Sequence, residues 1–199
     1  MKKALITGAS HGIGLAIAKE FLKNGIAFYD CSRTSGYNLL YKKDLEKAIS
    51  RAKVFDILIN NVGGMGTSKV ELSDLCMRKN YGIMKDLTLA YLSVPREWGR
   101  IVTIGSIYGK ERGINPWFDA SKAAEIAFMK CMSHKYIGTK TTMNTICPGR
   151  IDVGKTADSN IFMGKPEDVA HIVYFLCTDK AKHINGACIV VDGGESHSY

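Results

Sequence analysis

Near the N-terminus stands the stretch Ala4-Leu5-Ile6-Thr7-Gly8-Ala9-Ser10-His11-Gly12-Ile13-Gly14, and it decides the fold of the chain. Its leading apolar run predicts a strand, and apolar residues at positions 15, 17, 18, 21 and 22 predict a helix directly after the glycines. Such a succession places the unpaired N–H groups of the helix start where a pyrophosphate binds. Gly8 allows a tight turn, Gly12 lets a ligand approach the backbone, and Gly14 lets the helix pack on the strand. The stretch predicts a dinucleotide site, although three glycines also suit an ordinary turn of an α/β domain.

Apolar runs and helical patterns alternate along the rest of the chain. We expect helices between the strands, including one from Phe118 to about Tyr136 and one that ends near Lys53. The chain is short before Asp56, so we expect a compressed third strand at Tyr37–Leu40. The other predicted strands are Ala4–Thr7, Ala27–Ser32, Ile57–Asn60, Ile101–Ile104, Thr142–Ile146 and Ala187–Val191. Right-handed crossovers between them give a single-domain Rossmann-type α/β fold over residues 1–199, a doubly wound parallel sheet flanked by helices.

Length and composition agree with one domain. The chain has 199 residues, of which 46% are hydrophobic, and this is enough for one substantial buried sheet. No stretch has the roughly 18 apolar residues that span a bilayer, and the N-terminus enters a strand without a secretion signal. The six cysteines form no Cys-x-x-Cys pair. We therefore expect a cytoplasmic protein whose cysteines are small buried hydrophobes rather than metal ligands.

The formal net charge of +8 raises the question of an anionic partner. The lysines are spread along the chain, and the longest basic runs are Lys2-Lys3 and Lys42-Lys43. Neither a basic stripe nor interleaved aromatic residues occur. We expect a solvated surface, with no nucleic-acid or membrane partner, although the charge is compatible with attraction of a dinucleotide phosphate.

Further motifs follow in a fixed order along nearly the whole chain. The turn Thr7-Gly8-x-x-x-Gly12-x-Gly14 has a wider glycine spacing than Gly-x-Gly-x-x-Gly. After it come Asn60-Asn61-Val62-Gly63, Asn80, Gly99-Arg100-Ile101-Val102-Thr103-Ile104-Gly105-Ser106, Ala120-Ser121-Lys122-Ala123-Ala124, Pro148-Gly149-Arg150-Ile151 and Ile189-Val190-Val191-Asp192-Gly193-Gly194. Together they resemble the short-chain dehydrogenase/reductase family, which implies an enzyme that moves a hydride between a nicotinamide and a small carbonyl or alcohol substrate.

The same resemblance implies four catalytic positions: Asn80, Ser106, Phe118 and Lys122. In such enzymes a tyrosine at the place of Phe118 moves the proton, and the lysine lowers that tyrosine's pKa and holds the nicotinamide ribose. The serine positions the substrate oxygen, and the asparagine anchors a water chain to the lysine. Phenylalanine has no proton to give, so the ordinary mechanism fails at its general acid/base step.

Three explanations of Phe118 stay open. The chain is an engineered Tyr→Phe variant, which the retention of the other three residues favours. Alternatively, it is a natural dinucleotide-binding sensor that has given up turnover and controls a partner. The third explanation is that Tyr108, two residues beyond Ser106, supplies the proton, although Tyr108 also suits an ordinary loop aromatic.

The residues after the second strand favour NADP over NAD. Ser32 stands where an aspartate usually binds the ribose of NAD, and Arg33 follows it. A guanidinium binds a 2′-phosphate through charge-assisted hydrogen bonds, and His11 offers a second contact. The alternatives are a surface arginine and a His11 that only caps the turn. The resemblance implies cofactor contacts from Gly8, Ser10, His11, Gly12, Ile13, Gly14, Arg33, Thr34, Asn60, Asn61, Val62, Gly63, Lys122, Pro148, Gly149 and Ile151.

The substrate loop is expected at about residues 151–165 and is short for the family. Val153 takes the place of a threonine that commonly binds the nicotinamide carboxamide. The helix that starts at Phe118 is apolar around much of its circumference, which is typical of a helix that is buried or used to dimerise. We expect a homodimer or homotetramer with no bound metal.

Overall fold

The computed structural model describes residues 1–64, 73–113, 115–154 and 163–197. Its strands are β1 (Lys3–Thr7), β2 (Ala27–Cys31), β3 (Ile57–Asn60), β4 (Gly99–Ile104), β5 (Thr141–Pro148) and β6 (Cys188–Val191). Its α-helices are α1 (Gly12–Lys23), α2 (Lys42–Ala52), α3 (Ser73–Met77), α4 (Ile83–Leu92), α5 (Pro116–His134) and α6 (Pro166–Leu176). A π-helical turn η2 (Arg78–Gly82) and two 3₁₀ turns, η3 (Ile107–Gly109) and η4 (Asp179–Ala181), complete the described elements.

The six strands form one parallel sheet in the order β2-β1-β3-β4-β5-β6. β1 lies between β2 and β3, and its Leu5 lies opposite both Tyr29 of β2 and Leu58 of β3. β2 lies on one side of β1, and β3 to β6 follow on the other side. The direction in which successive strands are added therefore reverses between β1 and β3. At such a switch point the carboxyl ends of the strands border a crevice that binds ligands. The predicted doubly wound α/β fold is confirmed.

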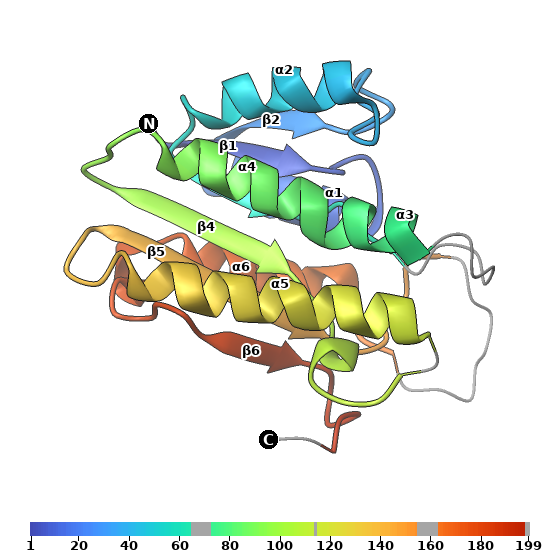
Figure 1. Ribbon diagram of the computed structural model, residues 1–199. Coiled ribbons are helices and arrows are strands. Elements are labelled where there is room, and N and C mark those ends of the chain that lie inside the picture. The colour runs from blue at the N-terminus through green and yellow to red at the C-terminus, as the bar shows by residue number, and fades with distance from the viewer. Residues whose placement is uncertain (65–72, 114, 155–162, 198–199) are drawn as a thin grey trace.

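Helices cover both faces of the sheet (Figure 1). One face packs on α1 and α6, and its buried core includes Ile6, Ile17 and Val173. The opposite face packs on α2, α4 and α5 around Leu5 and Leu87. Strands that are covered on both faces carry apolar side chains in both directions, which explains why β1 and β3 read as continuous apolar runs. Among the described helices, none combines the length and the apolar character needed to cross a membrane.

The predicted strand at Tyr37–Leu40 is wrong. The backbone N–H of Asn38 donates to the carboxylate of Asp44 in the first turn of α2, at 3.0 Å. The Tyr37 hydroxyl lies 2.9 Å from the Tyr29 hydroxyl, so its ring turns inward beneath α2. The segment therefore anchors the start of a helix and fills the core, and β2 forms the edge of the sheet.

The long helix predicted at Phe118–Tyr136 is confirmed as α5, which begins two residues earlier and ends two residues earlier. The side-chain oxygen of Asn115 accepts hydrogen bonds from the N–H groups of Trp117 and Phe118, which is the usual pattern of a helix N-cap. Pro116 occupies the first turn, where its missing N–H costs nothing. This start of the helix sets the position of Phe118 and Lys122 beside the end of β4.

Candidate functional site

The glycine turn has the shape that the sequence predicts for a phosphate site. Gly8 and Gly12 have φ angles of 72° and 54°, in the left-handed region that favours glycine. A Cβ on Gly14 would lie 2.1 Å from the carbonyl oxygen of Gly8, so no other residue fits there. The side chain of His11 at the N-cap makes no capping hydrogen bond, and its Nδ1 lies 3.1 Å from the Ser10 hydroxyl. The first N–H groups of α1 are thus left for another acceptor.

The end of β3 is tied directly to this turn. The Thr7 hydroxyl oxygen accepts hydrogen bonds from the backbone N–H groups of Asn61 and Val62, at 2.9 and 3.0 Å. The Asn61 side chain donates to the carbonyl oxygens of Thr7 and Gly8. Two of the predicted cofactor segments, which lie about fifty residues apart, are therefore brought together. The Asn60 side chain points elsewhere: it is buried and donates to the hydroxyls of Thr88 and Thr103.

An aspartate that the sequence analysis missed supports the turn from β2. The carboxylate of Asp30 accepts the N–H of Ala9 at 3.0 Å and the hydroxyl of Ser32 at 2.6 Å. Ser32 is buried, and its hydroxyl also lies 2.8 Å from that of Thr34. Arg33 is exposed beside them. The signal in the sequence was a carboxylate at the end of a mostly apolar strand, opposite the glycine turn.

Asn80 and Lys122 both lie close to Gly63. Asn80 lies in the π-helical turn η2, and such turns often occur at functional sites. Its side-chain oxygen accepts the N–H of Gly64 at 2.9 Å, and its side-chain nitrogen donates to the Ser121 hydroxyl at 2.7 Å. A Cβ on Gly63 would lie 2.9 Å from the Asn80 oxygen and 3.2 Å from Lys122 Nζ. Two predicted catalytic residues are thus brought to the segment after β3, next to the glycine turn.

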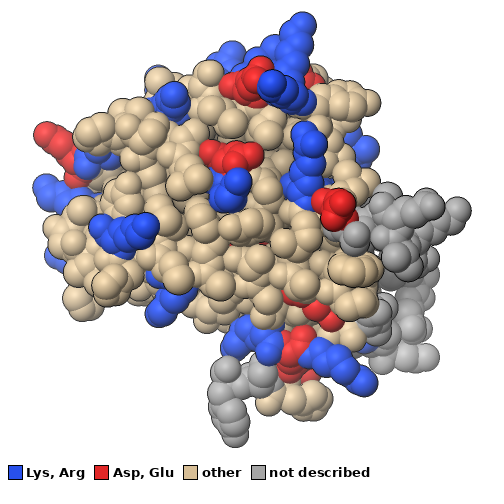
Figure 2. Space-filling view, in the orientation of Figure 1, with Lys and Arg blue, Asp and Glu red and all other residues tan. Residues whose placement is uncertain are grey.

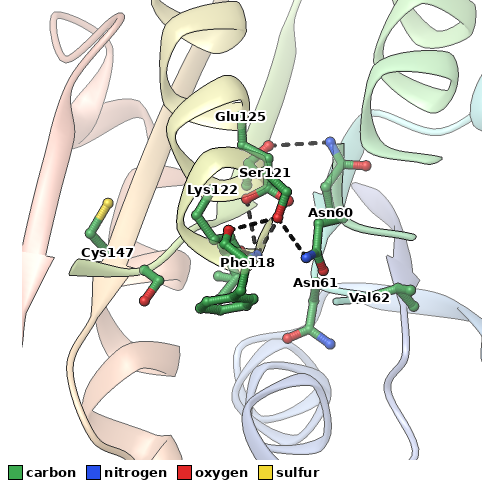
Figure 3. Close-up of polar contacts among 12 residues, drawn as sticks. Asn60, Asn61, Val62, Phe118, Ser121, Lys122, Glu125 and Cys147 are labelled. Atoms are coloured by element: carbon green, nitrogen blue, oxygen red, sulfur yellow. Dashed lines mark hydrogen bonds and ion pairs between the residues drawn. The ribbon is translucent and has the colours of Figure 1, made fainter. Parts of the chain in front are cut away.

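Lys122 is held by a buried glutamate that the sequence analysis also missed. Its Nζ donates to both carboxylate oxygens of Glu125, at 3.0 and 3.2 Å, and to the carbonyl oxygen of Ile104 at 2.9 Å. Burial raises the pKa of the Glu125 carboxyl, and the charge of Lys122 opposes this shift. The signal was a glutamate three residues after the lysine, because that spacing places both on one face of a helix. Figure 3 shows Phe118, Ser121, Lys122 and Glu125 on α5, facing the segment that carries Asn60 and Asn61.

Phe118 and Ser106 complete the predicted catalytic set. Phe118 is buried, and its ring centroid lies 5.7 Å from Lys122 Nζ. Ser106 caps the 3₁₀ turn η3, where its side-chain oxygen accepts the N–H of Tyr108 at 3.2 Å. The Tyr108 hydroxyl points to the carboxylate of Glu195 at 3.4 Å. The structure thus brings Lys122 close to Phe118 and directs the Tyr108 hydroxyl to a carboxylate.

The loop after β5 lies over the glycine turn. Pro148 ends β5, and Gly149 packs so closely that a Cβ there would meet Asp192 and Glu195. Ile151 pairs with Gly164, which joins the two ends of the predicted substrate loop. A Cβ on Gly12 would lie 3.0 Å from the Val153 side chain. Residues 155–162 of the predicted loop lie outside the described residues.

Histidine, cysteine, aspartate and glutamate side chains in the described ranges form no group of three that could hold a metal ion. The donors of the site are instead backbone N–H groups, amides, a hydroxyl and one ammonium. Such a set suits an organic ligand with phosphate and hydroxyl groups.

Comparisons with known proteins agree with this architecture. Residues 41–196 match a family model described as enoyl-(acyl carrier protein) reductase. The chain is 31% identical over 239 residues to 3-oxoacyl-(acyl-carrier-protein) reductase FabG of Buchnera aphidicola subsp. Schizaphis graminum, covering 97% of this chain and 96% of that protein. It is 30% identical over 235 residues to the protein of the same name from Rickettsia conorii, with the same coverage.

Solved structures give a similar result. An oxidoreductase of the short chain dehydrogenase/reductase family from Burkholderia thailandensis superimposes with a TM-score of 0.85 at 25% identity, over 97% of this chain and 92% of that one. A blue fluorescent protein from a metagenomic library, crystallised in complex with NADPH, has a TM-score of 0.84 at 25% identity and covers 97% of both chains.

Proposed function

This chain belongs to the short-chain dehydrogenase/reductase family of oxidoreductases, and we propose that it binds NADP(H) and acts on a small carbonyl or alcohol substrate. The proposal rests on the meeting of Asn80 and Lys122 at Gly63, in the segment after β3 that is hydrogen-bonded to Thr7 beside the glycine turn. Segments from four separate parts of the chain supply these groups. Their convergence at the carboxyl ends of the strands suits a dinucleotide that reaches from the turn to the lysine.

The residues present fit a dinucleotide phosphate. The backbone at Gly14 leaves no room for a side chain, and the uncapped start of α1 offers free N–H groups. Arg33 is exposed just after β2, which supports a 2′-phosphate, and the nearby Asp30 carboxylate is already engaged by the Ala9 N–H and the Ser32 hydroxyl. The NADPH complex of the structurally similar fluorescent protein points the same way. Two relatives are 3-oxoacyl-(acyl-carrier-protein) reductases, so a 3-oxoacyl thioester is the first substrate class to try.

When bound, the nicotinamide supplies or accepts the hydride. Lys122 would hold a ribose hydroxyl of the bound cofactor, and its ammonium would turn from Glu125 to do so. The Ser106 hydroxyl can donate to a substrate oxygen and orient it. Phe118 is buried and has no proton to give, so the general acid is missing from the position where the family needs it.

A second candidate function is a dinucleotide sensor without turnover. Two observations favour it: Phe118 lacks a hydroxyl, and the Lys122 ammonium is already engaged by two carboxylate oxygens and a carbonyl. A sensor retains the binding residues and loses only the proton-transferring group. It would bind a partner differently with and without the dinucleotide.

The experiment compares this chain with Phe118→Tyr and with Phe128→Tyr, which adds the same hydroxyl elsewhere on α5. NADPH binding is measured by fluorescence, and NADPH oxidation is followed with a 3-oxoacyl thioester and a panel of ketones and aldehydes. We expect all three chains to bind NADPH and Phe118→Tyr alone to gain about 10²-fold or more in rate. Binding by all three without turnover would favour the sensor. Failure of NADPH and NADH to bind would contradict both functions, and a fast unsubstituted chain would point to Tyr108.

A further inference from the structure

Two cysteines on neighbouring strands face each other behind the predicted site. Cys147 lies on β5 and Cys188 on β6, and their sulfur atoms are 3.2 Å apart. The register places Cys188 opposite Thr145 and Cys147 opposite Val190, so the two thiols are diagonal neighbours on one face of the sheet. Both are free thiols in the structure. The sulfurs need to approach by only about 1 Å to reach the roughly 2.05 Å of a disulfide.

Cys147 connects this pair to the end of β4. Its side chain is fully buried, and a Cβ on Gly105 would lie 3.3 Å from its sulfur. The backbone N–H of Ser106 donates a hydrogen bond to the same sulfur. Figure 3 shows Cys147 on the opposite side of Phe118 and Lys122 from Asn61. A chemical change at the Cys147 sulfur therefore alters a hydrogen bond to the backbone of Ser106.

Cys188 is the accessible member of the pair. It is half-buried and lines a recess of about 300 Å³. The other lining residues are Ile126 and Lys130 on α5, Thr145 on β5, and Gly186 and Ala187 before β6. Such a volume admits a small molecule. Lys130 Nζ donates to the carbonyl oxygen of Gly186 at 2.9 Å, which holds a positive charge at the edge of the recess.

The surroundings favour the thiolate form of Cys188. The hydrogen bond between the Cys147 and Cys188 thiols lowers the pKa of Cys188, the charges of Lys110 and Lys130 act in the same direction, and burial opposes them. Together they lower the pKa of Cys188 to about 7 and raise that of Cys147. The thiolate is the nucleophile in cysteine oxidation, so Cys188 is primed at neutral pH. Burial instead raises the pKa of Cys31 and of Cys177 to about 12.

We propose that Cys188 is an oxidation site for small hydroperoxides and that Cys147 resolves it into an intrachain disulfide. The Cys188 thiolate attacks one peroxide oxygen, so an S–O bond forms, the O–O bond breaks and the remaining alkoxide leaves as an alcohol after protonation. The Cys147 sulfur then attacks the sulfenic acid, so the S–S bond forms, the S–O bond breaks and water leaves with the Cys147 proton. Two thiols are oxidised by two electrons, and one hydroperoxide is reduced to an alcohol and water.

The first test treats the whole protein with about one equivalent of hydrogen peroxide, blocks the remaining thiols by alkylation and maps disulfides by peptide mass spectrometry. We expect a Cys147–Cys188 cross-link within single chains, which a dithiol removes. Cys131 is exposed and serves as the internal comparison. Oxidation of Cys131 while Cys147 and Cys188 both stay reduced would overturn the proposal. So would disulfides that join only separate chains.

Two variants and a pH series assign the roles. Cys147→Ser should leave Cys188 as a sulfenic acid that dimedone traps, whereas Cys131→Ser should leave the cross-link unchanged. The alkylation rate of Cys188 should rise about tenfold from pH 6 to pH 8 and then level off, whereas an ordinary thiol with a pKa near 8.5 keeps rising. If the alkylation rate of Cys188 rose with pH as it does for an ordinary thiol, the preferred oxidation of Cys188 would have no basis. The disulfide map is made on the unsubstituted chain. It therefore tests the proposal even if the Cys147→Ser variant does not fold.

Discussion

Lys122 and Glu125 are nearly fully buried, with 5% and 2% of their side chains exposed. Taking two opposite charges out of water is costly, and their mutual attraction compensates only when the hydrogen bonds are good. Here both carboxylate oxygens accept hydrogen bonds from the ammonium, and the carbonyl oxygen of Ile104 accepts a further one. The pair thus fixes the ammonium beside Phe118. Removal of either side chain would leave the other charge buried without its partner.

At this scale we predict that Glu125→Leu lowers the free energy of unfolding by about 3 kcal/mol, because it leaves the Lys122 charge buried without its partner. The double variant Lys122→Met/Glu125→Leu should regain most of that loss, since no uncompensated charge is left. Urea unfolding measures both. Glu46→Ala is the control, because its contact with Lys42 is an exposed pair worth at most about 1 kcal/mol. A double variant no more stable than Glu125→Leu would show that packing, and not the unpaired charge, causes the loss.

At the scale of elements, helix α5 has one side that faces the candidate site and one side that is exposed. Its inner side carries Phe118, Ser121, Lys122 and Glu125 toward the site, and all four are buried. Its outer side carries exposed small residues at 120, 123 and 127. Figure 2 shows that the front of the molecule over α5 is largely free of charged side chains. A helix with apolar or small residues on both sides is suited to pack against a second copy of the chain.

We predict that the chain forms a homodimer or homotetramer through this outer side of α5. Ala127→Arg should shift the protein toward monomer in sedimentation velocity, because it places a long charged side chain in the interface. Ser50→Arg adds the same charge to an exposed position of α2 and should leave the oligomer intact. A monomeric unsubstituted chain at tens of micromolar concentration would contradict the prediction.

At the scale of the whole molecule, the proposed ligand links elements that are far apart in the sequence. The glycine turn, the ends of β2 and β3, α5 and the loop after β5 border one region of the sheet's carboxyl edge (Figure 1). A ligand that binds only the folded chain stabilises all of them together. At a concentration 100 times its Kd, the stabilisation is about 2.7 kcal/mol.

We predict that NADPH raises the Tm of the chain more than NADH does at equal concentration. Arg33→Ala should reduce the NADPH effect toward that of NADH, because the guanidinium then no longer binds the 2′-phosphate. Thermal unfolding with each nucleotide measures both, and Lys23→Ala, at the far end of α1, is the matched control. An equal effect of the two nucleotides on the unsubstituted chain would count against NADP preference.

The sequence by itself determined the sheet and the glycine turn, because these depend on local patterns. Local sequence specifies local conformation here. This holds for the apolar runs of β1, β3 and β4 and for the glycines at 8, 12 and 14. The cap and proline at the start of α5 are equally local. The strand predicted at Tyr37–Leu40 is wrong because the buried side chains of Tyr37 and Leu39 suit a loop that fills the core as well as they suit a strand.

Only the tertiary structure decided which side chains meet. Asp30 supports the glycine turn, Cys147 lies against Cys188, and the Tyr108 hydroxyl points to Glu195, all across distances in sequence that no local pattern encodes. Glu125 was within reach of a local pattern, yet its importance comes from its burial beside Lys122. Contacts of this kind depend on which strands become neighbours and which helices cover them, and that is settled when the whole chain buries its apolar surface.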